Sequence, residues 1–284
     1  TIKETSIRDL INEQATFMWF QLFLETLLQM PQTVESKNEM INECLFNYEN
    51  DEIKKKKIIE FQQRHSSDTC IQWYTHDSFL YRLLNRALRT QNTNNIFKYR
   101  FFIKDLYQQL ENLLATTNDQ KQLGKPFADI QHYSYNKDEN EILFSMGTVF
   151  RIVSVELFTE EIWCVKLISN KEENKNLNDL ITHFKKEINK IEHHLLILGK
   201  FLYFMNDLHK AEKYYHLLFD QISSSALLFD DYYYRNEMIA ALFNNLGLVY
   251  YTRRNFELAL EYYKNALDIY LSHENKFIFQ YNDL

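Results

Sequence analysis

Apolar residues in the first third of the chain recur at the spacing of amphipathic helices. The clearest series covers residues 13–30, with Phe17, Phe20 and Leu24 on one side, and it ends before Pro31. Comparable patterns predict further helices over residues 34–48, 51–63, 78–89 (capped by Asp77 and Ser78) and 96–114. We therefore expect a small helical bundle within residues 1–123.

The pattern changes to short strands after Gly124. Apolar runs cover residues 142–144, 149–153 and 162–167, and turn residues separate them. These runs predict a short antiparallel sheet within residues 124–168. From about residue 170 the pattern is helical again, after the polar stretch 169–178.

A pattern of small and aromatic residues begins at Ala240. Small residues let two helices approach closely, and tyrosines fill the space between them. The matching positions are Leu246, Gly247, Tyr250, Ala259, Tyr263 and Ala266. Their spacing resembles a tetratricopeptide repeat, and Asn244-Asn245-Leu246-Gly247 resembles the kinesin-light-chain type of that repeat.

A weaker copy lies upstream, at Leu195, Leu198, Gly199, Leu202, Ala211, Tyr215 and Leu218. Gly199 and Gly247 are 48 residues apart, which exceeds the repeat unit of about 34 residues, so we expect a lengthened helix or an insertion near residues 223–231. The alternative is an ordinary helical hairpin with fortuitous small residues, and the six matches after Ala240 argue against it. Stacked hairpins expose a groove that typically holds a protein or peptide. Because two repeats are few for a free-standing array, further packing on the upstream domain or on other repeats is expected.

Composition narrows the class of protein. The formal charge of −7 disfavours a general nucleic-acid binder, because phosphate contacts need a basic surface. The apolar stretch from Ala15 to Met30 is interrupted by Gln21, Glu25 and Gln29, so we expect a buried helix and no membrane span. Three cysteines without a CxxC pair favour reduced thiols and a cytoplasmic location. The chain contains neither HExxH nor zinc-finger spacing, so no metal site is expected.

Two glutamates form the candidate catalytic pair. Glu139 and Glu141 lead into the apolar run 142–144, and on a strand both would point to the same side. A fixed carboxylate can stabilise the positive charge that develops on a ribose during glycosyl transfer, and a second can hold a cationic acceptor. Taken alone, such a pair is more often a solvated strand end.

The surrounding motifs resemble the C-terminal segment of arginine-specific ADP-ribosyltransferases of the Arg-Ser-Glu class. The motifs lie at residues 125–130, 133–135, 138–145 and 147–152, and the helices at 73–75, 78–89 and 99–106 resemble the N-terminal region of that family. The resemblance spans most of residues 12–168 and implies NAD as co-substrate and an arginine-bearing acceptor protein. It also implies that Glu141 is catalytic, binding the ribose and stabilising the oxocarbenium-like transition state, while Glu139 orients the target arginine. Transferases of this kind joined to kinesin-light-chain-like repeats are a familiar arrangement.

Two elements of that family are missing from the sequence. No arginine lies between Arg100 and Arg151, and Thr116-Thr117 is not followed by serine, so neither the NAD-gripping Arg nor the Ser-Thr-Ser strand is present. Without them NAD loses its main charge-assisted contacts, and we expect weak or no transferase activity.

We therefore expect an α-rich α+β architecture with an ADP-ribosyltransferase-like domain at 1–168 (a helical region at 1–123 and a β region at 124–168) and tetratricopeptide hairpins at 175–284. The sheet would be a remnant of the transferase fold. The expected function is mono-ADP-ribosyl transfer from NAD to protein arginine, impaired in this chain. A non-catalytic repeat scaffold for protein partners is the alternative, and a shortened version of an active enzyme is a third reading.

Overall fold

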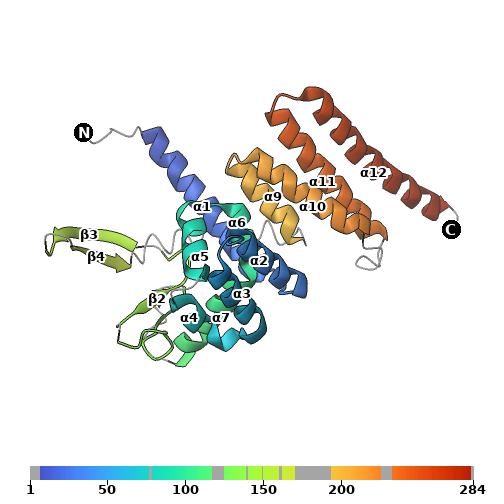
Figure 1. Cartoon of the computed structure of the whole chain (residues 1–284). Helices are drawn as coiled ribbons and strands as arrows, with labels where there is room; N and C mark the ends of the chain where they lie inside the picture. Colours follow the sequence, from blue (N-terminus) through green and yellow to red (C-terminus); the bar gives the residue numbers. More distant parts are fainter. Residues whose placement is uncertain are drawn as a thin grey trace. The chain divides into compact units, whose positions relative to one another are not determined.

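A computed structural model describes residues 7–76, 79–116, 125–138, 140–148, 150–159, 162–169, 193–224 and 232–282 (Figure 1). The chain divides into two compact units, one of residues 24–184 and one of residues 1–23 with 185–284. The described residues are mostly helical, with antiparallel strand pairs between the helical segments. Among the described helices, none is long and apolar enough to cross a membrane.

The helices of the first unit match the predictions at residues 34–48, 51–63 and 78–89 and differ from them at residues 96–114. They are α1 (Ile7–Gln29, which begins outside this unit), α2 (Val34–Asn47), α3 (Glu52–Arg64), the 3₁₀ turn η1 (Ser67–Thr69), α4 (Cys70–Thr75), α5 (Phe79–Arg89), α6 (Thr93–Lys98) and α7 (Arg100–Thr116). Local capping fixes where they start. The Thr33 hydroxyl accepts a hydrogen bond from the Ser36 N–H at 3.1 Å, and the Asp51 carboxylate accepts one from the Lys54 N–H at 2.9 Å.

The single helix expected over residues 96–114 is two helices. α6 ends at Lys98, and the N–H of Tyr99 donates back to the carbonyls of Asn95 and Phe97 before α7 begins. Tyr99 is only 1% exposed, so the break occurs where the chain buries a large ring. The predicted caps Asp77 and Ser78 lie outside the described residues.

Aromatic rings form the centre of this unit. Phe61 makes edge-on contacts with Phe79 at 5.8 Å and with Phe102 at 5.9 Å between ring centroids, and all three rings are fully buried. Because Phe61, Phe79 and Phe102 come from α3, α5 and α7, these contacts tie three helices together.

Among the described residues, the strands form two separate pairs, whereas the sequence predicted a single short sheet. β1 (Phe127–Asp129) pairs with β2 (Ile142–Phe144), and β3 (Phe150–Leu157) pairs with β4 (Trp163–Ser169), both antiparallel. The β1–β2 pair packs against α7. In the β3–β4 hairpin, an irregularity between Ile152 and Ser154 shifts the register by one residue.

The second unit contains α9 (His194–Phe204), α10 (Leu208–Ser224), α11 (Tyr232–Thr252) and α12 (Phe256–Asn282). These helices form antiparallel hairpins, α9 with α10 and α11 with α12, that lie side by side (Figure 1). The aromatic ring of Trp19, from the portion of α1 that belongs to this unit, stacks on Phe204 at 4.6 Å.

Candidate functional site

The two helical hairpins make the same close contact at their centres. A Cβ atom at Gly199 would lie 2.2 Å from Cε1 of Tyr215, and a Cβ atom at Gly247 would lie 2.6 Å from Cε1 of Tyr263. Both contacts join residues 16 positions apart, and the two pairs are offset by 48 residues. The upstream hairpin, which was predicted from a weaker pattern, therefore has the same close helix contact as the downstream hairpin.

The turns of the two hairpins also have the same backbone conformation and the same helix cap. Asn206 and Arg254 both have left-handed backbone angles, with φ of 60° and 63°. The next residues, Asp207 and Asn255, accept hydrogen bonds at their side chains from the N–H groups of Lys210 and Leu258, both at 3.3 Å. Each side chain thus caps the second helix of its hairpin.

Polar and aromatic contacts hold one hairpin against the other. The Glu212 carboxylate on α10 accepts a hydrogen bond from the Tyr250 hydroxyl and one from Arg253 Nη1, the latter at 2.7 Å. Nearby, the rings of Phe219 and Phe243 lie 5.7 Å apart. Partial burial acts to raise the pKa of Glu212, but the hydrogen bonds from Tyr250 and Arg253 outweigh it, so the pKa is lowered. These contacts fix α11 on one face of α10.

The equivalent face of α12 is exposed. We name Phe256, Leu260, Leu267 and Leu271 the α12 stripe, because they share one side of the helix at positions i, i+4, i+11 and i+15. Their side chains are 59%, 54%, 54% and 46% exposed. Leu260 and Leu267 stand 48 residues after Glu212 and Phe219, two of the α10 residues that contact α11. The exposed apolar side chains on α12 therefore occupy positions whose counterparts on α10 contact the next hairpin.

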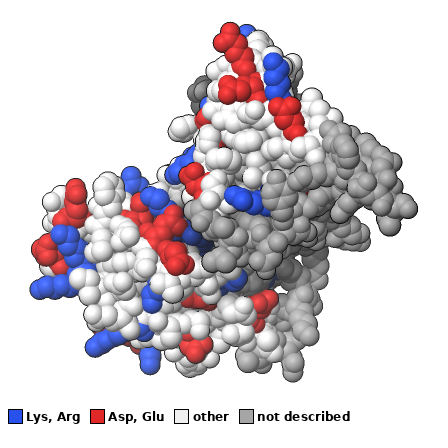
Figure 2. Space-filling view, turned by 90° about the vertical axis from the view of Figure 1, so that its right-hand side faces the viewer, with Lys and Arg blue, Asp and Glu red and all other residues white. Residues whose placement is uncertain are grey.

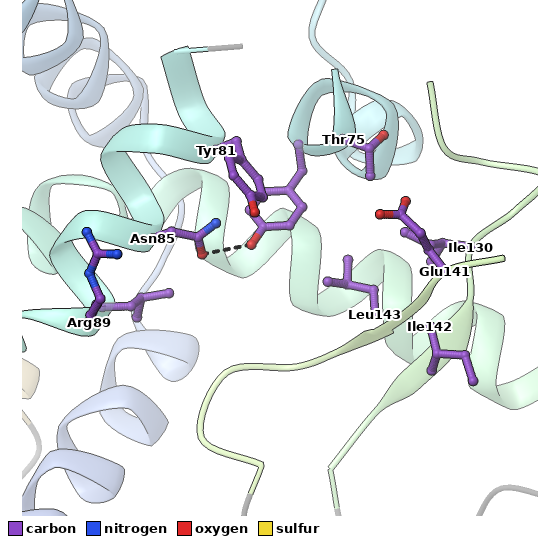
Figure 3. Close-up of a pocket in the computed structure, with 10 residues that line it drawn as sticks. Thr75, Tyr81, Asn85, Arg89, Ile130, Glu141, Ile142 and Leu143 are labelled. Atoms are coloured by element: carbon purple, nitrogen blue, oxygen red, sulfur yellow. Dashed lines mark hydrogen bonds between the residues drawn. The ribbon is translucent and has the colours of Figure 1, made fainter. Parts of the chain in front are cut away.

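A pocket of about 720 Å³ lies in the first unit, and Glu141 lines it (Figure 3). Glu141 directly precedes β2, its carbonyl accepts the N–H of Ile130 at 2.9 Å, and its carboxylate accepts the Ser134 hydroxyl at 3.2 Å. The position just before β2 and these two bonds hold the carboxylate at the pocket. Glu139, the other predicted site residue, lies outside the described residues, so its pairing with Glu141 stays a prediction.

The opposite side of this pocket comes from α5. Tyr81, Asn85 and Arg89 are spaced four residues apart, which places them on one helical face, and in Figure 3 Arg89 and Glu141 stand at opposite sides of the pocket. The Asn85 side-chain oxygen accepts the Tyr74 hydroxyl at 2.9 Å, and burial raises the pKa of Tyr74. The i, i+4, i+8 spacing was visible in the sequence, but nothing in the sequence indicated that α5 faces Glu141.

Charged side chains of both signs are interspersed on the face shown in Figure 2. The basic run from Lys54 to Lys57 lies in α3, where Lys55 pairs with Glu52 at 2.8 Å. The expectation that the chain does not bind nucleic acid stays a prediction from its net charge.

Comparison with known proteins supports the repeat assignment. Residues 240–273 match the tetratricopeptide repeat family, and this segment includes most of α11 and the first two thirds of α12. No curated protein and no solved structure matches the chain. None of these comparisons supports the resemblance to ADP-ribosyltransferases, so the sheet pairs are not shown to derive from that fold. What they do support is a tetratricopeptide repeat at the second hairpin, α11 with α12. We call the compact unit of residues 1–23 and 185–284 the repeat unit from here on.

Proposed function

We propose that the repeat unit is a protein-interaction module that binds a helical segment of a partner protein on the α12 stripe. The observation that carries this proposal is the exposure of Leu260 and Leu267 at positions equivalent to Glu212 and Phe219, which are partly buried where α10 meets α11. Clustered apolar side chains on an exposed surface mark interaction sites.

The character of the stripe indicates the partner's chemistry. On α10 the equivalent contacts are mixed, with an ion pair from Glu212 and a ring contact from Phe219. On α12 they are aliphatic, so the partner helix would present apolar side chains at i, i+3, i+4 and i+7 spacing. Burying these leucines supplies roughly 25 cal/mol per Å² of apolar surface removed from water.

Photo-crosslinking tests this proposal. A photoreactive amino acid at Leu267 should give one discrete adduct in cells, identified by mass spectrometry, and the same partner should be captured from Leu260. Asn265 is the control: it is also exposed on α12, but it points to another side because successive helical residues turn by about 100°. Adduct formation should disappear in a Leu260→Glu/Leu271→Glu variant. Equal labelling from Asn265, or no adduct from either leucine, would refute the proposal.

Mono-ADP-ribosyl transfer from NAD to a protein arginine is the second candidate function. Its support is the place of Glu141 in a pocket whose volume is typical of ligand sites, together with Arg89, which would face the phosphates of a bound dinucleotide. Glu141 would then stabilise the positive charge on the ribose, and Glu139 would hold the acceptor arginine.

Calorimetric titration with NAD tests this second function. Saturable binding that is weakened at least tenfold by Arg89→Ala, and arginine labelling that is lost in Glu141→Gln, would support it. Arg82→Ala is the matched control, because Arg82 also lies on α5 but does not line the pocket. Absence of binding at millimolar NAD would leave the repeat unit as the functional region of the chain.

A further inference from the structure

Three side chains that can bind metals meet inside the helical unit, away from the Glu141 pocket. Nε2 of His65 lies 3.3 Å from Sγ of Cys70 and 3.5 Å from Oδ2 of Asp105, and the three ligand atoms lie within 4.8 Å of one another. They come from three places in the fold: the residue after α3, the first residue of α4, and the second turn of α7. Cys70 is fully buried, and the side chains of His65 and Asp105 are 2% and 10% exposed.

The arrangement differs from a catalytic Cys–His–Asp relay. In a relay the thiol and the carboxylate contact opposite nitrogens of the imidazole, so that a proton can pass through the ring. Here the Cys70 sulfur and the Asp105 oxygen both approach the same nitrogen, Nε2. Burial also keeps a substrate from reaching the sulfur.

The two distances measured from Nε2 of His65 suit a tetrahedral metal ion. With Zn–N near 2.0–2.1 Å and Zn–S near 2.3 Å, tetrahedral ligand atoms stand roughly 3.3 to 3.6 Å apart. The two distances from His65 fall in or at the edge of that range. A cysteine, a histidine and an aspartate are also a donor set that Zn²⁺ uses in proteins.

Surrounding groups already hold these ligands in place. The His65 ring lies 4.5 Å from the Phe61 ring and 5.6 Å from the Phe101 ring, measured between centroids. The second oxygen of Asp105, Oδ1, accepts a hydrogen bond from Gln32 Nε2 at 2.6 Å, which leaves Oδ2 turned to His65. Hydrogen-bonded partners of this kind orient the ligands of known metal sites.

We propose that His65, Cys70 and Asp105 bind one Zn²⁺ ion that ties α3, α4 and α7 together. On binding, the Cys70 thiol releases its proton to solvent and the sulfur donates an electron pair to the ion; the thiolate and the carboxylate together balance the two positive charges. Three protein ligands leave the fourth tetrahedral position to a water molecule, and because the core encloses the ligands the ion would stabilise the fold.

Titration with Co²⁺, without any polyhistidine tag, tests the site. The parent for the test is a Cys164→Ser chain, since Cys164 is exposed and would bind metal adventitiously. We expect one Co²⁺ per chain, a near-ultraviolet absorption from the thiolate–Co²⁺ bond, and loss of that absorption after one equivalent of Zn²⁺. Cys70→Ser should abolish the absorption. Cys44→Ser should leave it unchanged, because Cys44 is an equally buried thiol outside the cluster.

Asp105→Asn is a second variant, which keeps the test decisive if Cys70→Ser does not fold. It keeps the shape of the side chain. It should weaken Co²⁺ binding at least tenfold and remove the rise in melting temperature that Zn²⁺ gives the parent chain. An absorption that is absent in the parent, that survives in Cys70→Ser, or that disappears in Cys44→Ser would overturn the proposal.

Discussion

At the scale of single residues, the repeat unit depends on two glycines that face tyrosine rings. Neither glycine is needed for a turn, since both lie inside helices; each lets a tyrosine ring approach so closely that a methyl group at the glycine would clash with the ring. Tyr215 is 1% exposed, whereas Tyr263 is only partly buried, so the two rings differ in how freely they can move away.

We predict that Gly199→Ala destabilises the repeat unit more than Gly247→Ala. Overpacking costs about 1–3 kcal/mol, and the better helix propensity of alanine returns up to about 1 kcal/mol. The Tyr263 ring can turn outward, so Gly247→Ala should cost about 1 kcal/mol or less, and Gly199→Ala about 2 kcal/mol. Urea unfolding followed by circular dichroism measures both, with exposed Asn244→Ala as the control. Equal losses at the two glycines would contradict this account.

At the scale of elements, the β3–β4 hairpin has one apolar face without cover. Residues that stand directly opposite each other share a face, and the pairs Leu157 with Trp163 and Val155 with Val165 lie together at 45–62% exposure. On the other face Ser154 stands opposite Lys166. A ribbon of this kind is prone to association.

Replacing the central pair by Val155→Thr/Val165→Thr should therefore reduce self-association. Threonine keeps the preference for strands while adding a hydroxyl to the exposed face. Light scattering and the fluorescence of an apolar dye, both followed against protein concentration, report the change. Ser154→Thr on the polar face should have no effect; a similar decrease there would mean that the apolar face is not responsible.

The contact between α10 and α11 should weaken in acid. The folded pKa of Glu212 lies below its ordinary value of 4.5, so its stabilising effect is complete above about pH 4.5 and is lost as the pH falls through the folded pKa. The difference in unfolding free energy between the natural chain and Glu212→Gln should thus be positive at pH 7 and should shrink progressively as the pH falls below 4.5. Because both chains carry the same other carboxylates, the contributions of those groups to the pH dependence of unfolding cancel in the difference. A difference that does not change with pH would show that the ion pair with Arg253 contributes nothing.

At the scale of the whole molecule, the division into two compact units predicts separable unfolding. Phe61→Leu leaves a cavity in the aromatic core of the first unit, and Gly199→Ala strains the repeat unit. Each variant should shift one of two calorimetric transitions and leave the other in place. A single transition that both variants shift equally would mean that the units unfold together.

The sequence by itself determined most of the helices, the places where strands occur, and the downstream repeat. Helical spacing, Pro31 and the cap at Asp51 are local signals, and the predicted helices at 34–48 and 51–63 match α2 and α3 within a residue. The small residues at Gly247 and Ala259 indicated the tetratricopeptide repeat because their spacing reports directly on helix packing.

Only the tertiary structure decided which distant residues meet. The two glycine–tyrosine contacts made the equivalence of the two hairpins clear. The placement of Glu141 opposite Arg89 depends on the packing of α5. Asp105, from a helix further along the chain, joins His65 and Cys70. Such contacts depend on how whole helices pack, and packing is set by the sum of many weak apolar contacts that no local pattern of residues contains.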